Sequence, residues 1–223
     1  MNINILGSSS SGNCTIIDNC LMIDFGLNKN QLLPYLNKVN YIICTHRHGD
    51  HYNKSIITWL KKNRPELFNF GLILNKDCAE LAGINYTPMN EFIEINTVNG
   101  ICELYLFPVK HDVECQGISI YKKETDELLI YATDLSILPD NSYIQEILNR
   151  YKRQDFDYIL LEANYDKDIL LEAMKNEALE DRAIRNLRHL SNDKWKLFVN
   201  AYSNDTTKYY QMHISEMFGK KLI

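Results

Sequence analysis

Residues Cys44 to Tyr52 read CTHRHGDHY, which places three histidines and an aspartate within six positions. The whole chain has six histidines, so half of them fall in this one segment. A continuous apolar run, Val39–Cys44, comes directly before it and predicts a strand that is buried on both faces. The pattern H-x-H-x-D-H therefore predicts a polar loop at the end of a buried strand.

The residue types in this loop suit metal binding. In an extended loop, residues two apart project to the same side, so His46 and His48 can bind one ion together. Asp50 and His51 lie a few positions further on and can face a second ion. Neutral imidazoles and carboxylates suit zinc, and also manganese or iron. The alternative interpretation is a chance polar loop that binds metal only adventitiously.

Three more polar residues each end an apolar, strand-like run: His111 after Ile101–Val109, Asp134 after Leu128–Thr133 and His213 after Thr207–Met212. Sheet folds gather functional groups at the carboxyl ends of their strands. Taken alone, each histidine is more often a surface residue than a metal ligand, and the aspartate is more often a turn residue. Their joint occurrence favours one shared site.

Length and composition set the broad class. The chain has 223 residues, of which 45% are hydrophobic and 24% charged, which predicts an ordinary globular protein of one domain rather than two. Strand-like runs come first and then mix with helical ones, which predicts an α/β fold of two sheets covered by helices, a four-layer αββα sandwich. The net charge of −5 argues against a protein that coats nucleic acid. It does not exclude a nuclease, because bound metal ions add local positive charge.

Cysteine usage predicts the compartment. The six cysteines are scattered, form no C-x-x-C motif, and follow an N-terminus without a signal-peptide pattern. We therefore expect reduced thiols and a cytoplasmic location. Cys14 and Cys44 are expected to be buried packing residues near the site. No apolar run is long enough to span a membrane, so no membrane partner is expected.

Several of these segments together resemble a known family. THRHGDH, the later strand-end histidine and aspartate, and the HIS near the end of the chain resemble the metallo-β-lactamase superfamily of metal-dependent hydrolases. The segments ILGSSSSGNCTII, YILLEANYD and RHLSND resemble one branch of it, which contains bacterial exonucleases acting on double-stranded DNA. Ribonuclease Z is a more distant relative. The resemblance covers essentially the whole chain and implies one αββα metallo-hydrolase domain over residues 1–223.

The resemblance also implies a role for each polar residue. Seven residues would hold two ions: His46, His48 and His111 the first, Asp50, His51 and His213 the second, with Asp134 bridging both. Asp50 would also orient the attacking water. His189 in RHLSND matches a histidine that assists the leaving group. Ser10, Ser11 and Asn13 would line the substrate entrance, and Asp112 could support His111.

The sequence also departs from the family pattern. VNAYSND is a rival match for the last ligand motif, with Ala201 at the histidine position; His213 is preferred because of its H-x-S pattern and strand-like lead-in. YNKS, from Tyr52 to Ser55, stands where the family has a glycine, at a place where substrate is expected to pass. Tyr165 in EANYD replaces another family histidine. These departures concern the substrate more than the metal ions.

The predicted function is a dinuclear metal-dependent phosphodiesterase, with two zinc ions or alternatively manganese, that acts on nucleic acid as a DNA-exonuclease-like nuclease. One alternative is a phosphodiesterase for a small cyclic signalling nucleotide, which the acidic charge and short chain favour. The second alternative is a catalytically degenerate binding module, against which the intact ligand set argues. Whether the chain forms a homodimer is left open.

Overall fold

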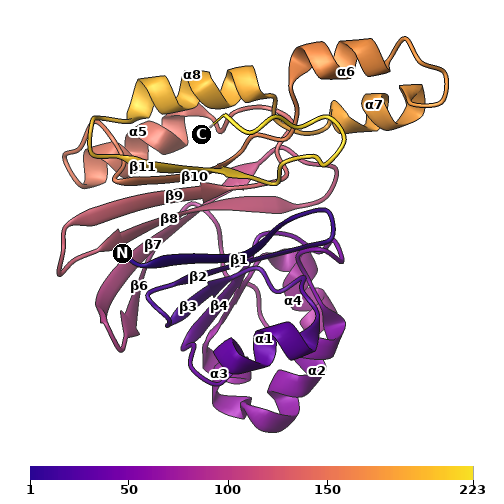
Figure 1. Ribbon diagram of the computed structural model, residues 1–223. Coiled ribbons are helices and arrows are strands. Elements are labelled where there is room, and N and C mark those ends of the chain that lie inside the picture. Colours follow the sequence, from indigo (N-terminus) through magenta and orange to yellow (C-terminus); the bar gives the residue numbers. More distant parts are fainter. Residues whose placement is uncertain (223) are drawn as a thin grey trace.

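Two β-sheets face each other and helices cover their outer faces (Figure 1). The computed structural model describes residues 1–222. The first sheet contains five strands in the order β1 (Ile3–Ser9), β2 (Gly12–Ile17), β3 (Leu21–Ile23), β4 (Tyr41–Cys44) and β5 (Leu72–Leu74). The second contains six in the order β11 (Lys208–Met212), β10 (Tyr158–Glu162), β9 (Glu127–Ala132), β8 (Cys115–Lys122), β7 (Gly100–Val109) and β6 (Phe92–Thr97).

The helices form the two outer layers. Those beside the first sheet are α1 (Lys29–Leu36), α2 (Lys54–Asn63), α3 (Pro65–Phe70) and α4 (Lys76–Ala82). Those beside the second are α5 (Asn141–Arg150) and α8 (Asn192–Tyr202), and α6 (Lys167–Ala173) and α7 (Glu180–Asn186) lie past its edge. The predicted four-layer αββα sandwich is therefore confirmed.

Part of each sheet is parallel, and this decides where the polar loops meet. β3, β4 and β5 pair in parallel in the first sheet, and β9, β10 and β11 do so in the second. The remaining pairs are antiparallel. Because neighbouring parallel strands end at the same edge, the loops that follow β3 and β4 gather together, as do those that follow β9, β10 and β11.

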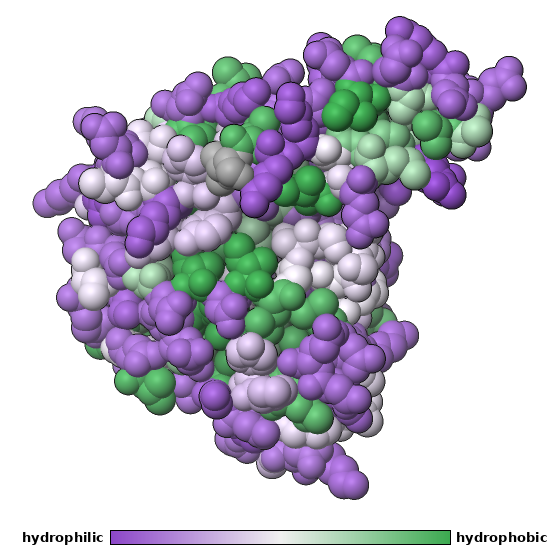
Figure 2. Space-filling model, in the orientation of Figure 1, coloured by the Kyte–Doolittle hydropathy of each residue, from purple (hydrophilic) through white to green (hydrophobic). Residues whose placement is uncertain are grey.

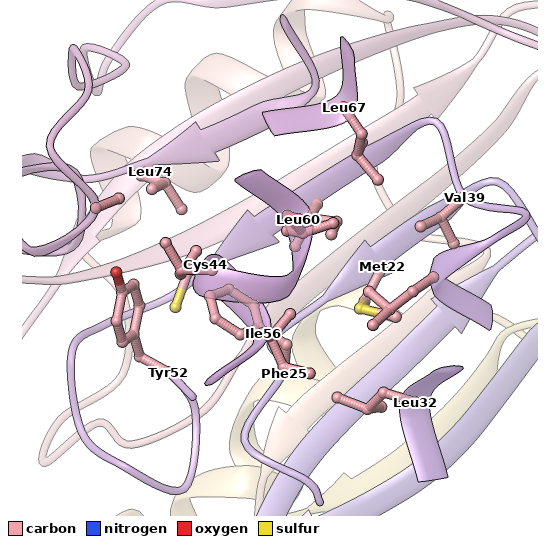
Figure 3. Packing of buried hydrophobic residues seen from close by; sticks show 14 of the residues in the cluster. Met22, Phe25, Leu32, Val39, Cys44, Tyr52, Ile56, Leu60, Leu67 and Leu74 are labelled. Atoms are coloured by element: carbon pink, nitrogen blue, oxygen red, sulfur yellow. The ribbon is translucent and has the colours of Figure 1, made fainter. Parts of the chain in front are cut away.

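Strand β4 is buried on both faces, as the apolar run predicted. Ile42 packs with the helices of the first layer and Ile43 packs between the sheets, and both are fully buried. Figure 3 shows the helix side of this packing, where Leu60 of α2 and Leu32 of α1 contact the sheet beside Met22. Cys14 and Cys44 are fully buried, as expected.

Some elements differ from the sequence expectation. The run 169–188, expected to be mostly helical, is divided into α6 and α7 by a turn in which the Asn176 side chain accepts a hydrogen bond from the Ala178 amide. Asparagine competes in this way with helical backbone bonding. Pro65, expected only to stop a helix, occupies the first turn of α3, where its missing amide costs nothing. Strand β6 was not expected.

The pair α6 and α7 projects beyond the two sheets (Figure 1). Figure 2 shows hydrophobic surface among the polar residues of this projection. Ile169, Leu171, Ile184 and Leu187 are its exposed hydrophobic residues. Across residues 1–222, no helix combines the length and the apolar character needed to span a bilayer.

Candidate metal centre

The loop after β4 is held by backbone hydrogen bonds from neighbouring segments. The Asn13 amide donates to the Asp50 carbonyl at 2.7 Å, and the Phe25 amide donates to the His51 carbonyl at 2.8 Å. Gly26 lies so close that a Cβ atom there would be 1.8 Å from the Asp50 carbonyl oxygen. Only glycine allows this approach. The polar loop is therefore fixed by the turn that follows β3.

The first cluster consists of three imidazoles. His48 Nδ1 lies 3.1 Å from His46 Nε2 and 3.3 Å from His111 Nε2. Ligands bound about 2 Å from one tetrahedral ion are about 3.3 Å apart, so these separations suit a shared ion. Burial lowers the pKa of both His46 and His111. Such histidines are neutral at pH 7, which is the form that binds metal.

The second cluster combines a carboxylate with two imidazoles. Asp50 Oδ2 lies 3.6 Å from His51 Nε2 and 3.7 Å from His213 Nε2. His213 Nε2 is buried and has no hydrogen-bond partner among the described residues. An unpaired buried nitrogen is costly, and a metal ion would satisfy it. These three side chains could hold a second ion.

Asp134 lies between the two clusters. Its Oδ2 is 2.8 Å from His51 Nε2, and its Oδ1 is 3.8 Å from His213 Nε2 and 4.0 Å from His111 Nε2. It therefore reaches members of both clusters, as a bridging ligand must. The seven predicted ligands have been brought together, although their assignment as ligands remains a prediction.

Three of the site residues share an uncommon backbone conformation at strand ends. Asp24, Asp134 and His213 have φ angles of 59°, 56° and 51°. Left-handed conformations cost energy for residues other than glycine and persist only where the surrounding structure imposes them. The turns after β3, β9 and β11 are therefore conformationally constrained at the site.

The electrostatics of the site come from mutual burial of acids and imidazoles. Burial alone would lower the pKa of His213, but the carboxylates of Asp134, Asp50 and Glu162 raise it to about 10. Burial also opposes the charged form of His51, yet Asp24 and Asp134 raise its pKa well above the usual range. The pocket strongly attracts positive charge. Together with the neutral imidazoles, this donor set fits two divalent cations.

Asp24 is a functional residue that sequence reasoning missed. It is fully buried and accepts hydrogen bonds from the Thr45 amide at 2.8 Å and the Thr45 hydroxyl at 2.9 Å. Its Oδ2 also lies 2.8 Å from His51 Nδ1. A carboxylate on one imidazole nitrogen orients the other toward a metal. Its position directly after the apolar run Leu21–Ile23 was the available signal, the same one that marked Asp134.

Glu162 is a second missed residue, and it contacts the predicted catalytic histidine. Its Oε1 lies 2.7 Å from His189 Nδ1 and 3.2 Å from His213 Nδ1. Its Oε2 accepts a hydrogen bond from the Leu135 amide at 2.8 Å. His189 Nδ1 is also 3.5 Å from Asp134 Oδ1. His189 therefore lies at the edge of the metal cluster, held by a fully buried carboxylate.

The three residues expected to line the substrate entrance have different surroundings. Ser10 lines a cavity next to His189 and His213, whereas Asn13 is fully buried with its Nδ2 2.9 Å from His51 Nε2. The expectation that Asn13 lines the entrance is therefore wrong. Ser11 is exposed, and its hydroxyl lies 2.7 Å from that of Ser9.

Asp112 and the rival ligand position occupy different surroundings. Asp112 Oδ1 lies 3.1 Å from His111 Nε2, and its Oδ2 accepts from Arg188 at 2.8 Å, so it does contact a predicted ligand. Ala201 is exposed on α8, outside the clusters that contain His213.

The first two residues of the YNKS segment have structural roles. Tyr52 is buried, with its ring centroid 5.1 Å from that of Phe25. The Asn53 side chain accepts a hydrogen bond from the Ser55 amide and so caps α2. Tyr165, at the position of the other replaced histidine, is also buried. Packing and capping therefore use the first two side chains of YNKS, whereas Lys54 and Ser55 are exposed. That substrate passes this segment stays a prediction.

No protein-family model matches the sequence. The chain is 24% identical over 225 residues to exodeoxyribonuclease WalJ of Streptococcus pneumoniae serotype 2 (strain D39), which covers 95% of this chain and 81% of that protein.

Solved structures resemble the whole fold. Human tRNase Z, short form, superposes with a TM-score of 0.62 at 12% identity, covering 97% of this chain and 93% of that one. Unliganded yeast PDE1 superposes with a TM-score of 0.61 at 12% identity, covering 96% of this chain and 88% of that one. The metallo-β-lactamase fold protein YhfI of Bacillus subtilis superposes with a TM-score of 0.53 at 16% identity, covering 74% of this chain and 73% of that one. The chain therefore has the metallo-β-lactamase fold, as the resemblance implied.

Proposed function

We propose that this protein is a dinuclear metal-dependent phosphodiesterase that cleaves nucleic acid. One observation carries the proposal: seven separately predicted side chains converge as two adjoining clusters that share Asp134. The likeness to exodeoxyribonuclease WalJ and to human tRNase Z supports a hydrolytic enzyme and a nucleic-acid substrate. A DNA strand is the favoured substrate because the sequence relative is named for it.

The first ion would be held by His46, His48 and His111, and the second by Asp50, His51 and His213, with Asp134 between them. Nitrogen-rich ligand sets favour zinc, and manganese is the alternative because the set also contains two carboxylates, Asp50 and Asp134. When bound, two such ions supply positive charge that lowers the pKa of water and neutralises phosphoryl oxygens.

The side chains of the protein would perform the proton transfers. Asp50 is partly exposed and can accept a hydrogen bond from the attacking water, which orients it toward phosphorus. His189 can donate a proton to the leaving oxygen. Glu162 accepts a hydrogen bond from His189 Nδ1, which fixes the ring and directs its Nε2 away from the carboxylate.

A cyclic nucleotide is the second candidate substrate. The cavity beside His189 and His213 has a volume of about 340 Å³, which is at the small end of ligand-binding cavities. A small substrate would suit it. The degenerate binding module is disfavoured because the described site retains every predicted ligand.

A metal-loaded activity panel tests the proposal. Wild type and Asp50→Ala would be compared on bis-p-nitrophenyl phosphate, linear DNA, RNA and 3′,5′-cyclic nucleotides, each with zinc and with manganese. Asp205→Ala is the matched control, since it removes an exposed carboxylate outside the two metal clusters. We expect turnover by wild type and by the control only. Two bound ions without hydrolysis of any phosphodiester would refute the proposal.

We further propose that residues 1–223 act as one domain and function in the cytoplasm. The continuous two-sheet core supports the first part. A homodimer remains a prediction, which sedimentation of the purified chain can test.

A further inference from the structure

Three of the chain's seven arginines fall within seven positions of α7 and the turn after it: Arg182, Arg185 and Arg188. Arg188 is paired, since its Nη1 donates to Asp112 Oδ2 at 2.8 Å. The described residues offer no carboxylate within 4.0 Å of the side-chain nitrogens of Arg182 or Arg185. Both side chains are exposed. Two guanidinium groups are thus left with unused hydrogen-bond donors.

These two arginines line the cavity of about 340 Å³ that also contains His189 and His213. Arg182, Arg185, Asn186 and His189 have the spacing i, i+3, i+4 and i+7, which places them on one face of a helix and its continuation. The unpaired guanidinium groups of Arg182 and Arg185 therefore lie on the same face as His189, the predicted proton donor. Ser10 and Ser215 line the same cavity from other segments.

The charge of the molecule makes this placement informative. The chain carries a net charge of −5, so its overall field repels a polynucleotide. A site for phosphate must therefore concentrate positive charge locally. Glu216 is the one carboxylate that lines the cavity, against two arginines. Guanidinium groups bind phosphate through two parallel hydrogen bonds, so this wall suits a phosphate that is not itself cleaved.

We propose that the cavity between α7 and the segment 213–218 is a subsite for a nucleotide adjoining the scissile phosphate, and that Arg182 and Arg185 bind its phosphate. The inference rests on the proposed function and sharpens it, because it assigns the enzyme to strands rather than to cyclic mononucleotides. A cyclic mononucleotide has one phosphate, which would occupy the metal ions and leave the arginines without an anion.

The first experiment measures binding without turnover. Fluorescein-labelled single-stranded DNA and RNA ten-mers would be titrated with the full chain in excess chelator, and anisotropy recorded at several salt concentrations. Arg182→Gln/Arg185→Gln is compared with Lys62→Gln/Lys196→Gln, which changes the net charge equally at exposed helix positions away from the cavity. We expect the arginine variant alone to bind roughly ten-fold or more weakly. Its slope of log affinity against log salt should fall by about 0.7 per lost phosphate contact.

The second experiment measures turnover by the metal-loaded enzyme. The arginine variant should lose kcat/KM on oligonucleotides but keep wild-type rates on bis-p-nitrophenyl phosphate and on cyclic nucleotides. Equal behaviour of the arginine and lysine variants, or equal losses on one-phosphate and strand substrates, would overturn the inference. Absence of oligonucleotide binding by wild type would do the same.

The two proposals can fail separately. If wild type hydrolyses nothing yet binds strands through the arginines, the proposed activity is wrong and the subsite stands. If it hydrolyses phosphodiesters but the arginines have no effect, the subsite is wrong. Single Arg182→Gln and Arg185→Gln variants, checked by circular dichroism, give the same comparison should the double variant fold poorly. The DNA and RNA arms show which strand is preferred.

Discussion

Asp24 acts on a metal ligand without lying in either cluster. Its carboxylate contacts His51 Nδ1, so a proton on that nitrogen leaves the Nε2 lone pair free toward Asp50 and Asp134. An amide in its place can satisfy part of this contact but carries no charge to stabilise it. The affinity of the second site for its ion should therefore depend on Asp24.

Asp24→Asn is expected to weaken metal binding by about 10- to 100-fold, because the partners of metal-bound histidines typically contribute that much. Competition between the protein and a chromogenic chelator measures the affinity. Asp205→Asn is the control for loss of a surface charge. Unchanged affinity in Asp24→Asn would show that His51 does not need this carboxylate as a ligand.

His213 and His189 should separate metal binding from proton transfer. His213→Ala is expected to lose one of two ions, whereas His189→Ala should keep both and lose about 10²- to 10⁴-fold in turnover. Metal content is measured by atomic emission, and turnover on linear DNA, whose alkoxide leaving group needs a proton. Two ions retained by His213→Ala would refute its assignment as a ligand. Metal loss from His189→Ala would make that residue a ligand instead.

The sequence predicted the convergent residues better than those that support them. His46 and His48 stand out because their spacing is local, and His111 and His213 because each ends an apolar run. Glu162 contacts His189 across 27 positions. Glu162 follows the apolar run Tyr158–Leu161, so the strand-end signal was available for it, but its contact with His189 was not.

At the scale of elements, Glu103 joins strand β7 to the end of α5. It accepts hydrogen bonds from Arg150 Nε at 3.1 Å, Arg150 Nη2 at 2.9 Å and the Tyr151 hydroxyl at 2.8 Å. The Arg150 bonds lower the pKa of Glu103, burial opposes this, and the Tyr151 bond adds to the lowering. This carboxylate is therefore more acidic in the folded chain than in the unfolded one.

A lowered folded-state pKa stabilises the fold above the unfolded value and loses that effect as pH falls through the folded value. Stability should therefore fall below about pH 4.3, the ordinary glutamate value. In Glu103→Gln the loss of unfolding free energy on acidification should be smaller than in wild type. The unfolding free energy at pH 7 should fall by about 1 kcal/mol. Urea unfolding at pH 7 and pH 3.5 measures both. Glu80→Gln, exposed on α4, is the control. An identical pH dependence in wild type and Glu103→Gln would contradict the link.

Periodicity predicted long elements more reliably than short ones. The strand Val39–Cys44 and the helix Ser55–Asn63 were predictable because their apolar patterns are strong. The turn between α6 and α7 includes a side-chain hydrogen bond of Asn176, and α3 begins at Pro65. Such details depend on side-chain contacts that an apolar pattern does not encode.

At the scale of the whole molecule, the metal centre joins the two sheets. The loop after β4 belongs to the first sheet, while His111, Asp134 and His213 follow strands of the second. Bound ions would therefore cross-link the layers, which otherwise adhere through apolar packing of residues such as Ile43 and Leu104. The sequence predicted both layers because strand-like runs come first and then mix with helical ones along the chain.

Removing the ions should lower the thermal midpoint. Free metal at a thousand times the dissociation constant stabilises the native state by about 4 kcal/mol, provided that it binds only that state. Calorimetry with and without chelator measures the change. His46→Ala/His213→Ala serves as the control in which chelator should have little effect. An equal chelator effect in wild type and this variant would place the stabilising metal elsewhere.

The edge position of β11 has a consequence for synthesis of the protein. β11 pairs only with β10 in the described sheet and carries His213 at its end. His46 and His48 leave the ribosome long before His213, and His111 leaves it about a hundred residues before. A nascent chain can therefore assemble its first ion site while the second still lacks a ligand. Maturation of the dinuclear centre would then be sequential, with the second ion entering only after the last strand docks.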